Sequence, residues 1–257
     1  MYPILFKLGS FELFTYGLMM ALGVLAGLVA VNFEAKRYGW DRDQMTRLVV
    51  WVFLMGLLGS RVVYVFTRMN EPNIDLVSIA FNLRAGFVYY GGLLASWLFL
   101  IWYVRRYKMP FWPVMDTFAY GICIGLAIGR IGCLLGGCCY GTPTDLPWGV
   151  IMANERQLGH LHPTQLYEFL VLVIMFVPLW LRRTRKRYEG EITVWFVGVY
   201  AIARYVLEIY RGDLIRGYVI DEVMTTSQFI SVPMLVVAVW LHFKLRGRRI
   251  KSGARAA

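Results

Sequence analysis

The sequence predicts an all-α polytopic membrane protein with seven transmembrane helices. Its 257 residues are 58% hydrophobic and 16% aromatic, with a mean hydropathy of +0.55, which lies outside the usual range of soluble domains. Apolar stretches long enough for about 20 residues of membrane helix recur along the chain. Positively charged residues gather in alternate loops between these stretches.

Seven apolar stretches define the predicted spans. They lie at about residues 14–33, 46–66, 86–104, 112–135, 164–181, 191–210 and 227–243. We expect the first to remain in the protein, because no convincing small-residue cleavage site follows it. No shift in composition marks a second domain. We therefore expect one transmembrane domain over 1–257, with a periplasmic loop at 137–163 and a basic cytoplasmic tail at 244–257.

The placement of lysine and arginine predicts the topology. Eighteen of the 27 basic residues lie in the C-terminal tail and in the loops after the first, third and fifth spans, whereas six lie in the opposite loops. By the positive-inside rule, we expect the N-terminus outside and the C-terminus in the cytoplasm. We interpret the net charge of +11 as a signal that sets the topology and as an anchor to anionic lipids, and we expect no nucleic-acid partner.

Three arginines lie within spans or at their ends. An intramembrane arginine costs at least about 2.5–3.5 kcal/mol on insertion scales, so Arg61, Arg130 and Arg204 are candidate functional residues. Structural alternatives are an ion pair of Arg204 with Glu208, and a contact of Arg61 with a carbonyl or with Asp116. Two guanidinium groups facing one cavity would suit a phosphate, here that of a lipid headgroup.

Other polar groups lie near span ends. His162 begins the segment HPTQLYE and could be a proton shuttle or a hydrogen-bonded cap. The segment GFVYYGG at 86–92 places two tyrosines and a Gly-Gly pair at the start of the third span. Tyr200 precedes Arg204 by one helical turn, so its hydroxyl lies on the same face.

Cys133, Cys138 and Cys139 are close in sequence, and Cys123 lies a few turns earlier. Neither a CxxC pair nor a histidine at a standard spacing supports a metal site, and we expect none. The thiols could pack as small apolar groups, or Cys133 could form a disulfide with Cys138 or Cys139. A redox-active pair would make the chain a membrane thiol-disulfide oxidoreductase.

The order and spacing of these motifs resemble the prolipoprotein diacylglyceryl transferases of bacterial inner membranes. The similar positions are Tyr16-Gly17, Gly59-Ser-Arg61 with Tyr64, Tyr90-Gly91-Gly92, Gly129-Arg130-Ile-Gly132 through Gly141, the run from His162 to Glu168, Tyr200 with Arg204, Glu208 and Arg211, and Ser227-Gln228 up to Pro233. Cys133, Gly136 and Cys138 stand where the family usually has Asn, Asn and Glu, and Tyr90 stands where it typically has a histidine.

The resemblance implies an enzyme that moves the diacylglyceryl group of phosphatidylglycerol to the lipobox cysteine thiol of prolipoproteins. A thioether forms, and glycerol-1-phosphate leaves. We expect a monomer of the bacterial inner membrane, active toward the periplasmic leaflet, with no cofactor. The implied catalytic residues are Arg130, Arg204, Tyr90 and His162. The implied substrate-binding residues are Tyr16, Arg61, Gly91, Gly92, Gly141, Gln165, Tyr200, Glu208 and Arg211.

Within this reaction, Arg130 and Arg204 fit the neutralisation of charge on the leaving phosphate. The attacking thiol, with an ordinary pKa of about 8.5, must lose its proton. A tyrosine is a poor base at neutral pH, so we assign the base to His162 and a headgroup contact to Tyr90. A third class, an anion transporter, is disfavoured because we recognise neither an internal repeat nor intramembrane carboxylates.

Overall fold

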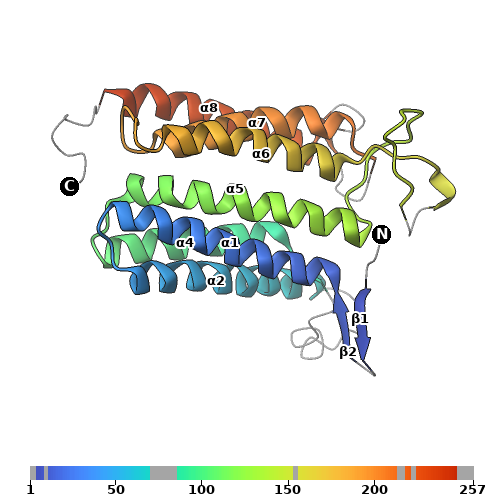
Figure 1. Ribbon diagram of the computed structural model, residues 1–257, viewed down its shortest axis with the longest axis horizontal. Coiled ribbons are helices and arrows are strands. Elements are labelled where there is room, and N and C mark those ends of the chain that lie inside the picture. Colours follow the sequence, from blue (N-terminus) through green and yellow to red (C-terminus); the bar gives the residue numbers. More distant parts are fainter. Residues whose placement is uncertain are drawn as a thin grey trace. The chain divides into compact units, whose positions relative to one another are not determined.

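The computed structural model describes residues 4–8, 11–69, 86–152, 156–212, 218–220 and 224–247. Its long helices are α1 (Thr15–Arg37), α2 (Arg42–Arg68), α4 (Tyr89–Arg106), α5 (Phe111–Gly136), α6 (Thr164–Arg182), α7 (Glu191–Ile209) and α8 (Thr226–Arg246) (Figure 1). The short elements are β1 (Ile4–Leu8), β2 (Phe11–Phe14), η1 (Arg156–Leu158), β3 (Tyr218–Ile220) and β4 (Met224–Thr225). The strands form two antiparallel hairpins that the sequence analysis did not predict.

Six helices in the described part of the chain are long and apolar enough to cross a membrane: α1, α2, α5, α6, α7 and α8. The prediction of a helical, polytopic membrane protein is therefore confirmed. The remaining helix, α4, forms near the predicted place but is not among the six. Its 18 residues begin with two tyrosines and end with Arg105 and Arg106, and these polar ends lower its mean hydropathy.

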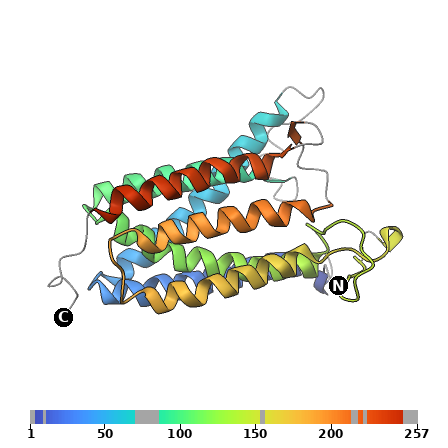
Figure 2. The ribbon, with the colours of Figure 1, turned by 90° about the horizontal axis from the view of Figure 1, so that it is seen from above.

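The chain folds as two compact units. Residues 34–114 form the smaller unit, and residues 1–33 with 115–257 form the larger one. In the larger unit, α7 lies between α6 and α8 (Figure 2). Its buried core includes Tyr120 and Cys123 of α5. The candidate site described below belongs to this larger unit.

Helices α2 and α4 pack closely in the smaller unit, because small residues line their crossing. A Cβ atom built on Gly91 would lie 2.6 Å from the carbonyl oxygen of Gly59. One built on Gly92 would lie 2.7 Å from the carbonyl oxygen of Gly56. Such close backbone approach is typical of small-residue interfaces between membrane helices. The structure thus gives Gly91 and Gly92 a packing role.

A buried carboxylate anchors the start of α7 to α5. Asp116 accepts hydrogen bonds from Nζ of Lys186 at 2.8 Å, from the backbone amide of Gly190 at 3.0 Å, and from the amide and hydroxyl of Thr193, each at 2.9 Å. Burying a carboxylate is costly unless its oxygens are paired, and here both are. This network fixes the α6–α7 loop near the start of α5. Cys133 lies at the other end of α5, and Glu168 lies at the other end of α6.

Candidate active site

Glu168 is the centre of a buried ionic cluster formed by α5, α6 and α7. Its Oε1 lies 2.8 Å from Nη2 of Arg130 and accepts a 2.8 Å hydrogen bond from the Tyr200 hydroxyl. Its Oε2 lies 3.9 Å from Nη1 of Arg204. The two arginines predicted to share a cavity therefore converge, each from a different helix, on one carboxylate of α6.

The cluster continues along α7. Nη2 of Arg204 lies 2.5 Å from Glu208, one turn further on, so the predicted ion pair is confirmed. The same nitrogen donates a 3.0 Å hydrogen bond to the hydroxyl of Ser227, at the start of α8. Glu208 also lies 3.9 Å from Nη1 of Arg211. The result is a line of alternating charges, in which each carboxylate contacts two guanidinium groups.

A small polar pocket lies among these side chains. Its lining residues are Arg130, Cys139, Thr164, Gln165, Glu168, Arg204, Leu207 and Arg211. The side chains leave about 0 Å³ of free cavity volume between them, whereas typical ligand pockets hold roughly 300–1,000 Å³. Within the part of the chain that the structure describes, the ion pairs of Glu168 with Arg130 and Arg204 occupy the space in which we expected a lipid headgroup.

The loop after α5 is held against the first turn of α6. The hydroxyl of Thr164 donates to the carbonyl of Cys139 at 2.8 Å, and Nε2 of Gln165 donates to the carbonyl of Cys138 at 2.6 Å. Gly141 donates its amide to the carbonyl of His162 at 2.9 Å. A Cβ on Gly141 would lie 2.5 Å from the Cβ of His162, so a side chain would not fit there. Gln165 thus lines the pocket, whereas Gly141 ties the loop to the segment before α6, and the substrate contacts of both residues stay predictions.

His162 belongs to a neighbouring hydrogen-bond chain. Its Nδ1 lies 3.1 Å from the hydroxyl of Tyr167, which accepts a 2.8 Å hydrogen bond from Nε1 of Trp148. Its ring also meets the ring of Tyr210 at 5.4 Å, edge to face. His162 is not among the side chains that line the pocket. Its backbone, however, carries the carbonyl that positions Gly141.

Two predicted site residues of the smaller unit have local contacts. Arg61 is buried, and its Nη1 donates a 2.6 Å hydrogen bond to the carbonyl of Gly86, so the carbonyl alternative is confirmed. Its guanidinium also lies 5.4 Å from the ring centres of Tyr64 and Phe87. Tyr90 is 49% exposed and packs edge to face with its neighbour Tyr89. Arg61 therefore fixes the chain that leads into α4.

Tyr16, the remaining predicted contact, opens α1 in the larger unit. Its side chain packs against the end of α5: a Cβ atom built on Gly136 would lie 3.7 Å from the Cβ of Tyr16. It is 42% exposed.

Cys139 joins the pocket to a group of three thiols. The sulfur atoms of Cys133, Cys138 and Cys139 all lie within 4.8 Å of one another, and none of the three is in a disulfide, so neither proposed disulfide is formed. Interactions with the thiols of Cys133 and Cys138, followed by the charges of Arg211 and Arg130, lower the pKa of the Cys139 thiol.

Sequence reasoning missed the role of Glu168. The residue stands in the HPTQLYE segment, but it was not predicted as a site residue. The argument that the spans lack carboxylates is wrong, because Glu168, Glu208 and Asp116 are all buried within long helices. An acidic residue at the start of an apolar span was the available signal.

These observations define a helical membrane protein with a buried ionic pocket near the ends of its helices. The family pattern described as prolipoprotein diacylglyceryl transferase matches residues 3–244. Similar proteins named phosphatidylglycerol–prolipoprotein diacylglyceryl transferase come from Clostridium tetani (31% identity; 94% of this chain and 96% of the relative), Legionella pneumophila strain Lens (34%; 95% and 97%) and Pseudomonas aeruginosa strain LESB58 (32%; 93% and 91%). The chain belongs to the prolipoprotein diacylglyceryl transferase family.

Proposed function

We propose that this protein transfers the diacylglyceryl group of phosphatidylglycerol to the cysteine thiol of a prolipoprotein. Membership of the family over residues 3–244 supports this activity over a thiol-disulfide oxidoreductase or an anion transporter. The structural observation that carries the proposal is the convergence of Arg130 and Arg204 on one pocket. Two planar guanidinium groups can bind a phosphate through paired hydrogen bonds.

The reaction makes one bond and breaks another. The sulfur of the deprotonated cysteine attacks a glyceryl carbon, while the bond from that carbon to a phosphate oxygen breaks. Glycerol-1-phosphate leaves with the electron pair of that bond, and the thiol proton passes to a base. Arg130 and Arg204 stabilise the charge that develops on the leaving phosphate. Glu168 holds both guanidinium groups in place until the lipid phosphate replaces it.

An apolar groove next to Arg204 supports a membrane-bound substrate. It lies between α7 and α8 and has a cavity volume of about 250 Å³. Its lining residues are Ala201, Ile202, Tyr205, Val206, Ser231, Val232 and Leu235. Ala201 and Tyr205 flank Arg204 along α7, so an acyl chain in this groove would lie beside the arginine that binds its headgroup.

The charge pattern supports the orientation of this site. We propose seven spans in one transmembrane domain, with α4 as the seventh, the N-terminus outside and the C-terminus cytoplasmic. The pocket at the start of α6 then faces the periplasmic leaflet of a bacterial inner membrane. There phosphatidylglycerol presents its headgroup and the prolipoprotein presents its cysteine thiol. We propose that the protein acts as a monomer.

The activity is tested with purified protein, phosphatidylglycerol and a synthetic lipobox peptide. Mass spectrometry should detect the peptide with one diacylglyceryl group attached at its cysteine, together with free glycerol-1-phosphate. A peptide with serine in place of that cysteine is the control, and it should remain unmodified. An unmodified cysteine peptide, with folded protein and phosphatidylglycerol present, would contradict the proposed activity.

A further inference from the structure

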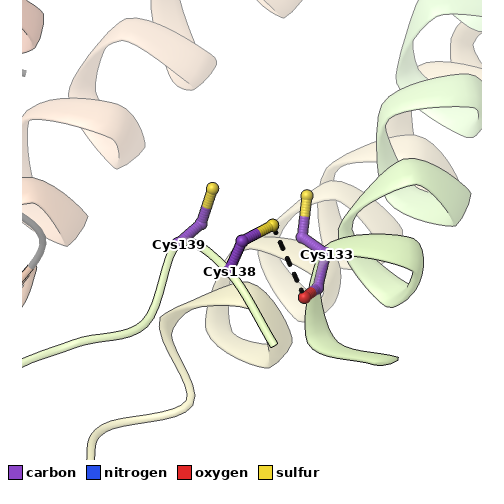
Figure 3. Close-up of side chains that lie close together, drawn as sticks. All are labelled: Cys133, Cys138 and Cys139. Atoms are coloured by element: carbon purple, nitrogen blue, oxygen red, sulfur yellow. Dashed lines mark hydrogen bonds between the residues drawn. The ribbon is translucent and has the colours of Figure 1, made fainter. Parts of the chain in front are cut away.

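Three thiols converge at the end of α5. Cys133 lies in the last turn of the helix, and Cys138 and Cys139 lie in the loop that follows. Figure 3 shows the sulfur of Cys138 directed toward Cys133, with the sulfurs of Cys133 and Cys139 nearby. All three sulfur atoms lie within 4.8 Å of one another. A disulfide would use two of these thiols and leave the third, whereas all three sulfur atoms lie close together.

Backbone contacts hold the three residues in this arrangement. The amide of Cys138 donates to the carbonyl of Cys133 at 3.1 Å, and its thiol lies 3.8 Å from the same oxygen. The side chains of Thr164 and Gln165 fix the carbonyls of Cys139 and Cys138. A binding site needs such support, because its ligand atoms must be in position before the ligand arrives.

The loop adopts a strained backbone at the same place. Gly137 has a φ of 73° and Cys139 has a φ of 65°. A positive φ is common for glycine but uncommon for a cysteine, and such strain is often found at binding sites. Here the turn at Gly137 reverses the chain after α5, and the turn at Cys139 follows directly. The tight turn brings the thiols of the loop back to the helix.

The surrounding charges favour a negatively charged group. Cys139 lines the same pocket as Arg130 and Arg211. Three thiolates around a divalent cation carry a net charge of one negative unit, which the neighbouring guanidinium groups stabilise.

We propose that Cys133, Cys138 and Cys139 form a three-thiolate site for a thiophilic metal ion of the zinc class. On binding, the three thiols release their protons and each sulfur forms one bond to the ion at about 2.3 Å, which for a tetrahedral ion places the sulfurs about 3.8 Å apart. The sulfurs need to close only slightly from their present separation. From the sequence we expected no metal site, because the Cys-x4-Cys-Cys spacing matches no standard zinc motif.

The test measures metal binding alone, without phospholipid or peptide, so its outcome is independent of the proposed transfer activity. Full-length protein in detergent is reduced with a phosphine, freed of reductant and titrated with Cd²⁺, whose bonds to thiolates give an ultraviolet charge-transfer band. Zn²⁺ affinity is then measured by competition with a chromogenic chelator. We expect one ion per chain.

Serine variants identify the ligands. Cys133→Ser, Cys138→Ser and Cys139→Ser should each lower the affinity by at least about tenfold, since even substitutions around a metal site cost this much. Cys123→Ser is the matched control, because Cys123 is a buried thiol elsewhere on α5, and it should bind as the unaltered protein does. A Zn²⁺-dependent rise in melting temperature, present in the control and lost in the other three, separates lost binding from misfolding.

Three results would overturn the proposal. The first is the absence of one-to-one binding to the folded, reduced protein. The second is equal loss of affinity in Cys123→Ser and in the three cluster variants. The third is a thiol count that finds two of the four thiols missing from protein isolated without reductant, because a disulfide would then occupy the site.

Discussion

At the scale of single residues, the ion pair between Arg130 of α5 and Glu168 of α6 is the contact at the centre of the pocket. The pair of Arg204 with Glu208 could be predicted, because residues four apart share a helix face. The contact of Arg130 with Glu168 could not, because it joins α5 to α6 and depends on how these helices pack. Likewise, the three cysteines were recognised as neighbours in sequence, but only the turns at Gly137 and Cys139 bring their sulfurs together.

The lowered pKa of Cys139 predicts an unusual pH dependence of its alkylation. An ordinary thiol, with a pKa of about 8.5, loses reactivity about tenfold per pH unit below that value. Cys139 should lose less of its reactivity with iodoacetamide between about pH 8 and about pH 6 than an ordinary thiol does, because its lowered pKa leaves a larger fraction of thiolate. Mass spectrometry of the modified peptide measures this rate.

Two comparisons test the cause of this shift. Cys133→Ser removes the first cause of the lowered pKa, so the alkylation rate of Cys139 should then fall with falling pH. In denatured protein the same fall is expected. If the alkylation rate of native Cys139 depends on pH as it does in denatured protein, the lowered pKa of Cys139 is wrong.

His162 is predicted to receive the proton of the attacking thiol. Its Nδ1 is held by the Tyr167 hydroxyl, which leaves Nε2 as the nitrogen that exchanges the proton. His162→Gln should therefore lower turnover by about 10²-fold or more, as loss of a general base commonly does. Near-normal turnover in His162→Gln, with activity lost in Tyr90→Phe, would reverse the assignment of the two residues.

At the scale of elements, hydropathy predicted where the long helices lie. The span predicted at 164–181 is observed as Thr164–Arg182, and that at 191–210 as Glu191–Ile209. The two hairpins were not predicted, because strands of two to five residues carry little periodicity. The resemblance implied Gly91 and Gly92 as substrate contacts, which stays a prediction; the structure shows in addition that they lie where α4 meets α2.

The close crossing of α2 and α4 predicts the effect of one added methyl group. In Gly91→Ala, the new Cβ would lie 2.6 Å from the carbonyl oxygen of Gly59 and 2.6 Å from Cγ2 of Val63. We expect a loss of about 1–3 kcal/mol in the free energy of unfolding, as is usual for overpacking. Thermal unfolding in detergent measures the change.

Gly17→Ala is the matched control for this prediction. Gly17 also lies in a long helix, but nothing lies within 4 Å of a Cβ built on it. We expect it to be neutral, or more stable by up to about 1 kcal/mol, because alanine favours helix more than glycine does. Equal stability of Gly91→Ala and Gly17→Ala would show that the crossing is looser than described.

For the whole molecule, the charge pattern predicts the orientation in the membrane. A green fluorescent protein fused after Gly247 should fluoresce, because we place the C-terminus in the cytoplasm. An alkaline phosphatase inserted in the 137–163 loop should be active, because we place this loop in the periplasm. An inactive insert, together with an active phosphatase at the C-terminus, would invert the topology and move the site to the cytoplasmic leaflet.

The central claim is that Arg130 and Arg204 together bind the phosphate of the lipid. Arg130→Lys and Arg204→Lys retain the charge but cannot form paired hydrogen bonds. Arg182→Lys is the control, because Arg182 pairs with Glu191 at the opposite end of α6. The measurement is kcat/KM for diacylglyceryl transfer to a lipobox peptide. We predict a fall of about 10²-fold in each pocket variant and little change in the control; full activity in both pocket variants would contradict the claim.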